Sequence, residues 1–295
     1  MSTRAPLLVA LFAATTVACL VTRADDSSTE GAVQGGALDT TMGYAVGVRA
    51  GGSVCSGTLI APNLVLTARH CIAEGPSDPV DCKRDRFDAA TSPSGVTITT
   101  DARIGSGKGT HAVKSVFVPA SDDHVCGADI ALLVLADLVP SKEAVPATPV
   151  VRFPMTDKTR VGREVVVAGF GVTDATANDA GRRRVKEHVP ILCVPGDLSL
   201  SCSLFQSDRE FTTEGSVCFG DSGSGAYDQA SVGKGAPLVL GVLSRGLPLG
   251  KTCADATYTR TDKYAPFLIE TALVAAKRGG YTAPAWATGA VGDGG

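Results

Sequence analysis

The sequence lacks an excess of charge of either sign, because 27 lysine and arginine residues face 30 aspartate and glutamate residues, for a net charge of -3. Phosphate backbones are bound by clustered positive charge, so this balance argues against a nucleic-acid partner. With 44% hydrophobic and 19% charged residues, the composition also excludes an intrinsically disordered chain and a polytopic membrane protein.

Metal-binding motifs are missing as well. No two cysteines stand in the Cys-x-x-Cys spacing of a zinc site, and the four histidines are scattered along the chain. The stretch from 84 to 101 contains no carboxylate-rich loop suited to calcium. We therefore expect no metal site.

Uninterrupted stretches suited to long helices are rare, because 34 glycines and 16 prolines punctuate the 295 residues. Short apolar runs alternate with turn residues, which favours an all-β fold. We predict strands over the ranges 44–48, 53–60, 63–67, 130–135, 163–169, 185–193 and 237–244. One amphipathic segment, 262–277, predicts a single helix near the C-terminal end.

Residues 1–24 are typical of a secretory signal peptide, because Arg4 precedes an apolar run that is shorter than the roughly 20 residues needed to span a bilayer. An uncleaved anchor or a buried first strand is the alternative interpretation. Cleavage before Cys19, as in a bacterial lipoprotein signal, competes with cleavage after Ala24. Residues 25–32 are polar and acidic, which predicts a short linker or propeptide, and the composition of 278–295 predicts a flexible tail.

The cysteine count fits an oxidising compartment. The chain has nine cysteines, and without Cys19 in the leader an even set of eight remains. The sequence by itself leaves on the order of a hundred pairings of eight cysteines open.

Three segments each place a reactive polar residue beside an apolar strand or in a glycine-rich turn. His70 follows the strand 64–67, Asp129 begins the apolar run 129–135, and Ser222 stands among three glycines in 218–225. A serine hydroxyl becomes a good nucleophile when a histidine takes its proton and a carboxylate orients that histidine. Together the three residues therefore predict nucleophilic catalysis.

The motifs Thr-Ala-Arg-His-Cys, Asp-Ile-Ala-Leu-Leu and Gly-Asp-Ser-Gly, in this order, resemble those of the trypsin-like (chymotrypsin-fold) serine peptidases of the secreted bacterial type. Further likenesses lie at 55–60, 168–171, 244–246 and 258–260, so the resemblance covers residues 33–277. It implies two packed six-stranded antiparallel β-barrels with a C-terminal helix. An α/β-hydrolase is excluded, because its triad residues follow a different order and its serine lies in Gly-x-Ser-x-Gly.

The resemblance also implies roles for individual residues. His70 would act as general base and then acid, Asp129 would orient it, and Ser222 would attack the scissile carbonyl. The backbone N–H groups of Gly220 and Ser222 would form the oxyanion hole, and Ser244 would support Asp129. No cofactor is implied.

The same resemblance implies disulfides that join Cys55 to Cys71, Cys193 to Cys202 and Cys218 to Cys253. This set leaves Cys82 to pair with Cys126. Each bridge is expected to contribute a few kcal/mol to stability.

Activation is a further expectation from the family. Val-Gln-Gly-Gly at 33–36 resembles the start of the mature chain, so cleavage after Ala32 would free the amine of Val33 to pair with Asp221. Asp221 would then be structural rather than catalytic.

The substrate pocket departs from the trypsin pattern. Ser216 stands where a trypsin has an aspartate, Gly246 keeps the entrance open, and the methyl group of Ala256 would make the pocket shallow. These residues predict a preference for uncharged apolar side chains before the scissile bond, although Arg245 replaces a family tryptophan nearby. By strand alternation we expect Arg69, next to His70, to point to solvent.

We therefore expect a secreted, monomeric serine endopeptidase that acts on protein or peptide substrates, with a protein inhibitor as a further partner and membrane attachment only if Cys19 is lipidated. A lipid-anchored protein of the bacterial envelope is the alternative location. The alternative function is a binding protein that retains the fold without turnover. Intact motifs favour the enzyme, but they do not separate a peptidase from a general acyl hydrolase.

Overall fold

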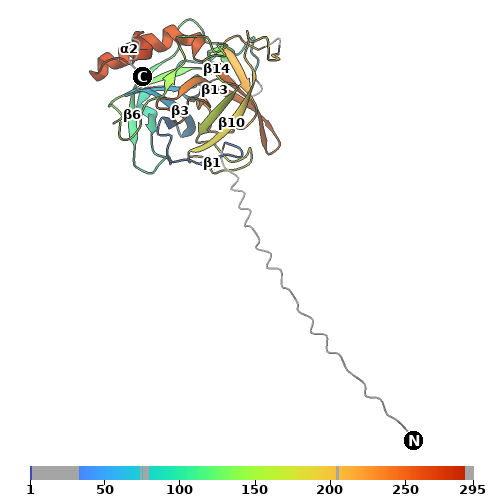
Figure 1. The fold of residues 1–295 in the computed structure, drawn as a ribbon. Helices are drawn as coiled ribbons and strands as arrows, with labels where there is room; N and C mark the ends of the chain where they lie inside the picture. Colours follow the sequence, from blue (N-terminus) through green and yellow to red (C-terminus); the bar gives the residue numbers. More distant parts are fainter. Residues whose placement is uncertain (2–32, 74, 76–79, 204–205, 290–295) are drawn as a thin grey trace.

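The computed structural model describes residues 1, 33–73, 75, 80–203 and 206–289. The predicted leader and linker lie outside the described residues apart from Met1, as do Cys19, Ala24 and Ala32. Figure 1 shows the described residues from Val33 onward folded into β-sheets, with helix α2 along the outside. No described helix is long and apolar enough to cross a membrane.

The N-terminal half forms a closed six-stranded barrel in the order β2-β3-β4-β7-β6-β5, with every pairing antiparallel. Its strands are β2 (Ala45–Ala50), β3 (Ser53–Ala61), β4 (Leu64–Thr67), β5 (Val96–Thr99), β6 (Thr110–Phe117) and β7 (Ala131–Leu135).

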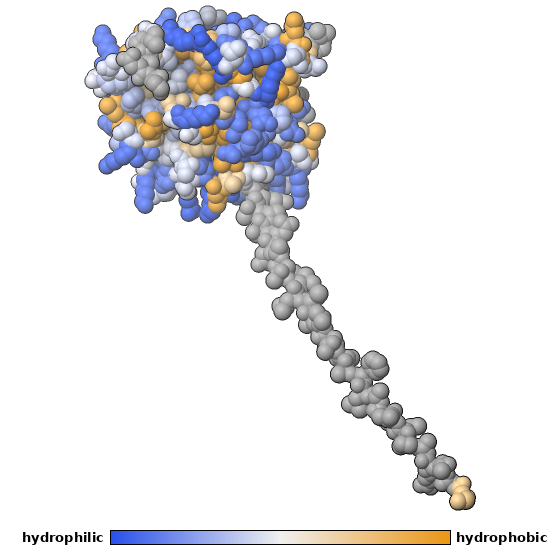
Figure 2. All heavy atoms as spheres, in the orientation of Figure 1, coloured by the Kyte–Doolittle hydropathy of each residue, from blue (hydrophilic) through white to orange (hydrophobic). Residues whose placement is uncertain are grey.

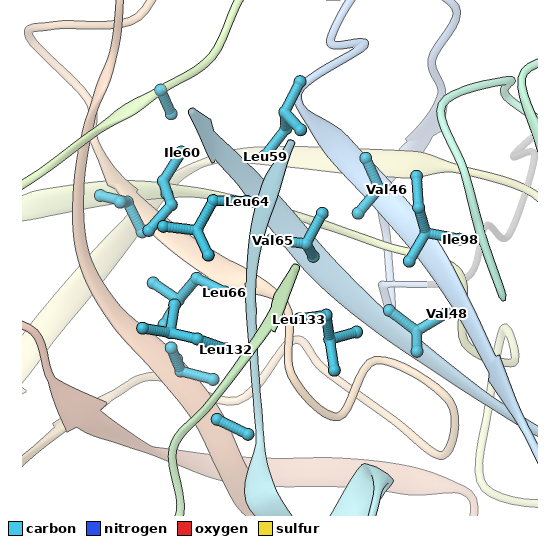
Figure 3. Packing of buried hydrophobic residues seen from close by; sticks show 14 of the residues in the cluster. Val46, Val48, Leu59, Ile60, Leu64, Val65, Leu66, Ile98, Leu132 and Leu133 are labelled. Atoms are coloured by element: carbon cyan, nitrogen blue, oxygen red, sulfur yellow. The ribbon is translucent and has the colours of Figure 1, made fainter. Parts of the chain in front are cut away.

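The interior of this barrel is built from aliphatic side chains. Leu59, Val65 and Leu133 have no solvent-exposed surface, and Figure 3 shows them near Val46, Val48 and Ile98 of β2 and β5. Burying one such side chain contributes roughly 2 kcal/mol. The apolar runs therefore fix the strands on either side of the site residues.

The C-terminal half forms a second six-stranded antiparallel barrel, in which β9-β12-β13-β14-β11-β10 closes through the pairing of β10 with β9. Its strands are β9 (Glu164–Gly169), β10 (Arg184–Cys193), β11 (Glu210–Thr213), β12 (Gly225–Asp228), β13 (Leu238–Leu249) and β14 (Thr252–Arg260). Two short strands are added at its edges, β1 (Ala37–Leu38) beside β10 and β8 (Thr148–Pro149) beside β13. The predicted all-β architecture of two barrels is confirmed.

The predicted helix is present as the turn η3 (Asp262–Tyr264) followed by α2 (Ala265–Gly279). Gly280 ends α2 in a left-handed conformation with φ +69°, which glycine adopts without a Cβ penalty. Leu268 and Ala272 on its inner face are fully buried in the first core. The helix thus covers the N-terminal barrel from the C-terminal end of the chain.

The prediction of a flexible tail from 278 onward is wrong for the described part, 278–289. This segment folds back and ends in α3 (Ala285–Thr288). Trp286 is buried, and its indole N–H donates to the carbonyl of Ile60 at 3.2 Å. One aromatic residue therefore anchors a segment whose overall composition is typical of a tail.

Four disulfides join the described cysteines: Cys55–Cys71, Cys193–Cys202 and Cys218–Cys253, as the family resemblance implies, and Cys82–Cys126, the pair expected by exclusion. Two of them flank the site residues directly, since Cys71 follows His70 and Cys218 begins the loop of Ser222. On the face drawn in Figure 2, hydrophilic and hydrophobic residues are interspersed, as on an ordinary water-exposed surface.

Candidate active site

A cavity of about 980 Å³ opens where the two barrels meet. His70 and Asp129 line it from the first barrel, and Ser222 and Ser244 line it from the second. The structure thus brings the three predicted reactive residues into one cleft, although 59 residues separate the first two and Ser222 lies in the other barrel.

His70 lies in the short turn η1 (Arg69–Cys71), which follows directly from β4. The Cys55–Cys71 bridge ties this turn to β3. The backbone N–H of His70 also donates to Oδ1 of Asp129 at 3.0 Å. The main chain of the histidine is therefore held on both sides, and its ring has little freedom to leave the cleft.

Asp129 lies between the short helical turn α1 (Val125–Ala128) and β7. Its side chain is 1% exposed, and its Oδ2 lies 2.7 Å from His70 Nδ1 and accepts a hydrogen bond from Ser244 Oγ at 2.7 Å. Burial raises the pKa of this carboxyl, but the charge of His70 and the hydrogen bonds from His70 and Ser244 together lower it below its usual value. The carboxylate is thus ionised and aimed at the histidine.

Ser222 lies in a turn made possible by glycines. Gly220 and Gly223 have φ values of +95° and +82°. Residues that carry a Cβ rarely adopt such positive φ values, whereas glycine adopts them readily. Ser56 of the first barrel holds this turn: its backbone N–H donates to the carbonyl of Ser222 at 2.7 Å, and its Oγ donates to the carbonyl of Gly220 at 3.0 Å. Among the described residues, the N–H groups of Gly220 and Ser222 have no protein acceptor, so both are available to an oxygen in the cleft.

The fold and these motifs agree with a known family. The family model described as Trypsin matches residues 34–268. The chain belongs to the trypsin family.

Individual relatives of this trypsin-family chain are distant. It is 26% identical over 225 residues to phenoloxidase-activating factor 3 of Holotrichia diomphalia, a match that covers 71% of this chain and 61% of that relative, so less than two thirds of the relative's length is spanned. It is 29% identical to a trypsin of Saccharopolyspora erythraea, covering 75% and 87% of the two chains. It is 24% identical to trypsin Blo t 3 of Blomia tropicalis, covering 77% and 80%.

Asp221, next to Ser222, is fully buried in the trypsin-family fold. Its two carboxylate oxygens accept hydrogen bonds from the backbone N–H groups of Gly171 and Cys218, each at 2.8 Å. Burial nevertheless raises the pKa of Asp221 to about 6, against the lowering effect of backbone N–H groups that include that of Val33. Val33 itself is fully buried, so the structure brings together the two residues expected to pair on activation.

The three residues predicted for the substrate pocket differ in their access to the cavity. Gly246 lines it, whereas Ser216 and Ala256 are fully buried and outside its lining. Ala256 lies opposite Gly246 in the pairing of β13 with β14. The Oγ of Ser216 has no hydrogen-bond partner among the described residues. The lining beside Gly246 comes from Val217, Leu243 and the Cys218–Cys253 bridge.

Two arginines lie near the site, and the position of Arg69 differs from the prediction. Arg69 is buried rather than solvent-exposed: it donates to the carbonyl of Asp122 at 2.9 Å and lies over the ring of Phe87. The prediction from strand alternation is wrong because β4 ends at Thr67 and the chain enters the turn η1. Arg245 lines the cleft and forms an ion pair with the buried carboxylate of Glu210.

One whole wall of the cleft was not predicted from the sequence. Side chains between the first two site residues, including Ile72, Phe87, Val96 and Val125, line the cavity beside His70. The Cys82–Cys126 bridge fastens this segment to the turn before Asp129. The two cysteines were the only local signal that this segment is held against the site.

Proposed function

We propose that the protein is a serine endopeptidase that cleaves peptide bonds through an acyl-enzyme intermediate. His70 takes the proton of the Ser222 hydroxyl as the serine oxygen attacks the scissile carbonyl. It then donates a proton to the leaving amine, and Asp129 stabilises the imidazolium that forms in between. The N–H groups of Gly220 and Ser222 bind the oxyanion, where the loss of one donor typically costs about 3 kcal/mol of barrier. Water then hydrolyses the ester, and His70 again acts as the base.

One observation carries this proposal. The buried, ionised Asp129 accepts hydrogen bonds from both the backbone and the ring of His70, at 3.0 and 2.7 Å, in the same cleft as Ser222. Burying an ionised carboxylate that is only 1% exposed costs free energy. A purely structural role for Asp129 would require neither a histidine partner nor a position in a cleft. Orienting a general base requires a histidine partner and a position in a cleft.

Active-site labelling tests the proposed function. The purified mature protein should react with a phosphonyl fluoride, and peptide mapping by mass spectrometry should place the adduct on Ser222. His70→Ala should abolish labelling while leaving the thermal unfolding transition in place, because a merely accessible hydroxyl would not depend on the histidine. A correctly processed, folded protein that stays unlabelled would favour the binding homologue instead.

We further propose that the enzyme prefers an uncharged, apolar residue before the scissile bond. Ser216 offers no counter-charge for an arginine or lysine side chain, and Val217 and Leu243 give the lining beside Gly246 an apolar character. Cleavage of a proteome-derived peptide library should therefore yield apolar residues on the amino side of the cut sites. A majority of cuts after arginine or lysine would contradict this preference.

We also propose export and proteolytic activation. The leader-like residues 1–24 and four disulfides favour an oxidising compartment outside the cytoplasm. Cleavage after Ala32 would free the amine of Val33 beside Asp221. The intact mass of the active protein from the culture medium tests both points, since it should correspond to a chain that starts at Val33. An active form that starts elsewhere, or remains with the membranes through Cys19, would contradict them.

A further inference from the structure

Arg245 and Glu210 form a bidentate ion pair at the edge of the cleft. The two terminal nitrogens of Arg245 lie 2.6 and 2.9 Å from the two carboxylate oxygens of Glu210. Glu210 is 1% exposed, whereas Arg245 is 28% exposed and lines the cavity. Two parallel hydrogen bonds of this kind fix the orientation of both side chains. Because Glu210 is buried, its charge would be left uncompensated without Arg245.

Each member of this pair also contacts the surroundings of Asp129. Glu210 Oε1 accepts a hydrogen bond from the backbone N–H of Gly127 at 2.8 Å, two residues before Asp129. Arg245 donates to Ser244 Oγ at 3.3 Å, and this hydroxyl donates in turn to Asp129 at 2.7 Å. Glu210 and Arg245 are therefore connected to the carboxylate of Asp129 in two ways, through the backbone near Gly127 and through the hydroxyl of Ser244.

We propose that Glu210 and Arg245 together position Asp129 and that their opposite charges cancel at His70, so that the loss of either charge alone would move the pH range in which His70 works as a base. The proposal rests on the catalytic function proposed above. Only the hydroxyl of Ser244 lies between Arg245 and Asp129. At this distance the charge of Arg245 or of Glu210, if left without its partner, would shift the pKa of His70. Neither residue touches the reacting atoms, so both are positioning residues rather than catalytic ones.

Other ionisable groups face the same region from neighbouring elements, and all of them stay in place when only Glu210 and Arg245 are changed. They are Arg69 on η1, Asp122 and His124 before α1, Arg209 before β11, Asp221 beside Ser222, and Tyr264 on η3. Several are already paired, since His124 and Arg209 both bond to Asp122. A change in the pH profile on altering the pair therefore reports the pair itself.

The test compares the pH dependence of kcat/KM for Glu210→Gln, Arg245→Gln and the double variant with that of the wild type. The midpoint of the acid limb reports the histidine of the free enzyme. Glu210→Gln leaves the Arg245 charge unopposed, which disfavours a protonated His70, so the midpoint should fall by about half a pH unit. Arg245→Gln leaves the Glu210 charge unopposed, so the midpoint should rise by a similar amount. The double variant should return close to the wild-type midpoint.

Opposite shifts that cancel in the double variant support the proposal, because a merely structural role would lower the rate at all pH values without moving the midpoint. Equal midpoints, or shifts in one direction for both single variants, overturn it. Glu210→Gln retains an oxygen acceptor for the Gly127 N–H and decides the test alone if Arg245→Gln does not fold. Labelling of the wild type at Ser222 is measured alongside. If the wild type is unlabelled, the catalytic function itself fails, whereas a labelled wild type with unmoved midpoints refutes only the role of the pair.

Discussion

Replacing Asp129 with asparagine should lower kcat about ten-thousand-fold with little change in KM. The carboxylate accepts from the backbone N–H and the ring of His70 and from Ser244, and it has no proton to donate. An asparagine of the same shape must point its NH2 group at one of these donors. The imidazole then turns or adopts the other tautomer, and its Nε2 no longer accepts the serine proton.

The measurement is kcat on a small ester and on a peptide substrate, with thermal unfolding recorded for each variant. Asp122→Asn is the matched control, because Asp122 contacts His124 and Arg209 rather than His70. It should keep kcat within about tenfold, as expected for a change outside the machinery. A fully folded Asp129→Asn protein with more than a tenth of the wild-type kcat would falsify the assigned role of this carboxylate.

Replacing Asp221 with asparagine should change the stability of the uncleaved chain and the activity of the processed enzyme in different ways. Burial raises the pKa of Asp221 from 3.8 to about 6, so the folded state binds its proton more tightly than the unfolded state does. Its contribution to stability is therefore complete below about pH 4 and is lost as the pH rises through about 6. Relative to the wild type, the free energy of unfolding of Asp221→Asn should rise by about 3 kcal/mol between about pH 3 and pH 7.

In the processed enzyme the same substitution should reduce kcat/KM by a hundredfold or more, by the order of magnitude of one lost oxyanion donor, about 3 kcal/mol. The free amine of Val33 would lose its counter-charge, and the turn that carries Gly220 would lose the carboxylate that accepts from Gly171 and Cys218. Urea unfolding of the uncleaved chain across this pH range and kinetics of the processed chain give the two results. A constant difference in stability at every pH would exclude a buried, high-pKa carboxyl at this position.

The apolar runs made much of the fold predictable. The cores of β4, β7 and β9 are nearly continuous aliphatic segments, and the predicted ranges of these strands and of β3 agree with the structure to within about two residues. The strands β5, β6, β11, β12 and β14 were not predicted as such. β14, for example, carries Thr252, Asp255 and Thr257 among small residues, and it becomes a strand because it pairs with β13 along its length. Its local sequence contains little of that tertiary information.

In the candidate site, too, some residues could be predicted from the local sequence and others could not. His70, Asp129 and Ser222 stand in short motifs whose chemistry is visible locally, and the structure places them in one cleft. Glu210 could not be found in this way, because its contact with Gly127 spans 83 residues and depends on the packing of one barrel against the other. Trp286 was missed for a related reason, because its indole donates to the carbonyl of Ile60, a residue 226 positions away in the chain.

The buried Ser56 has a consequence for how the protein folds. Its hydroxyl accepts from the N–H of Phe170 at 3.0 Å and donates to Gly220, so one side chain of the first barrel joins two loops of the second. Neither half can complete the serine loop without the other, and a chain cut between the barrels would regain its serine chemistry only by complementation of the two fragments. We therefore expect the barrels to lose structure in a single cooperative transition, with catalytic competence as sensitive a reporter of their docking as any spectroscopic signal.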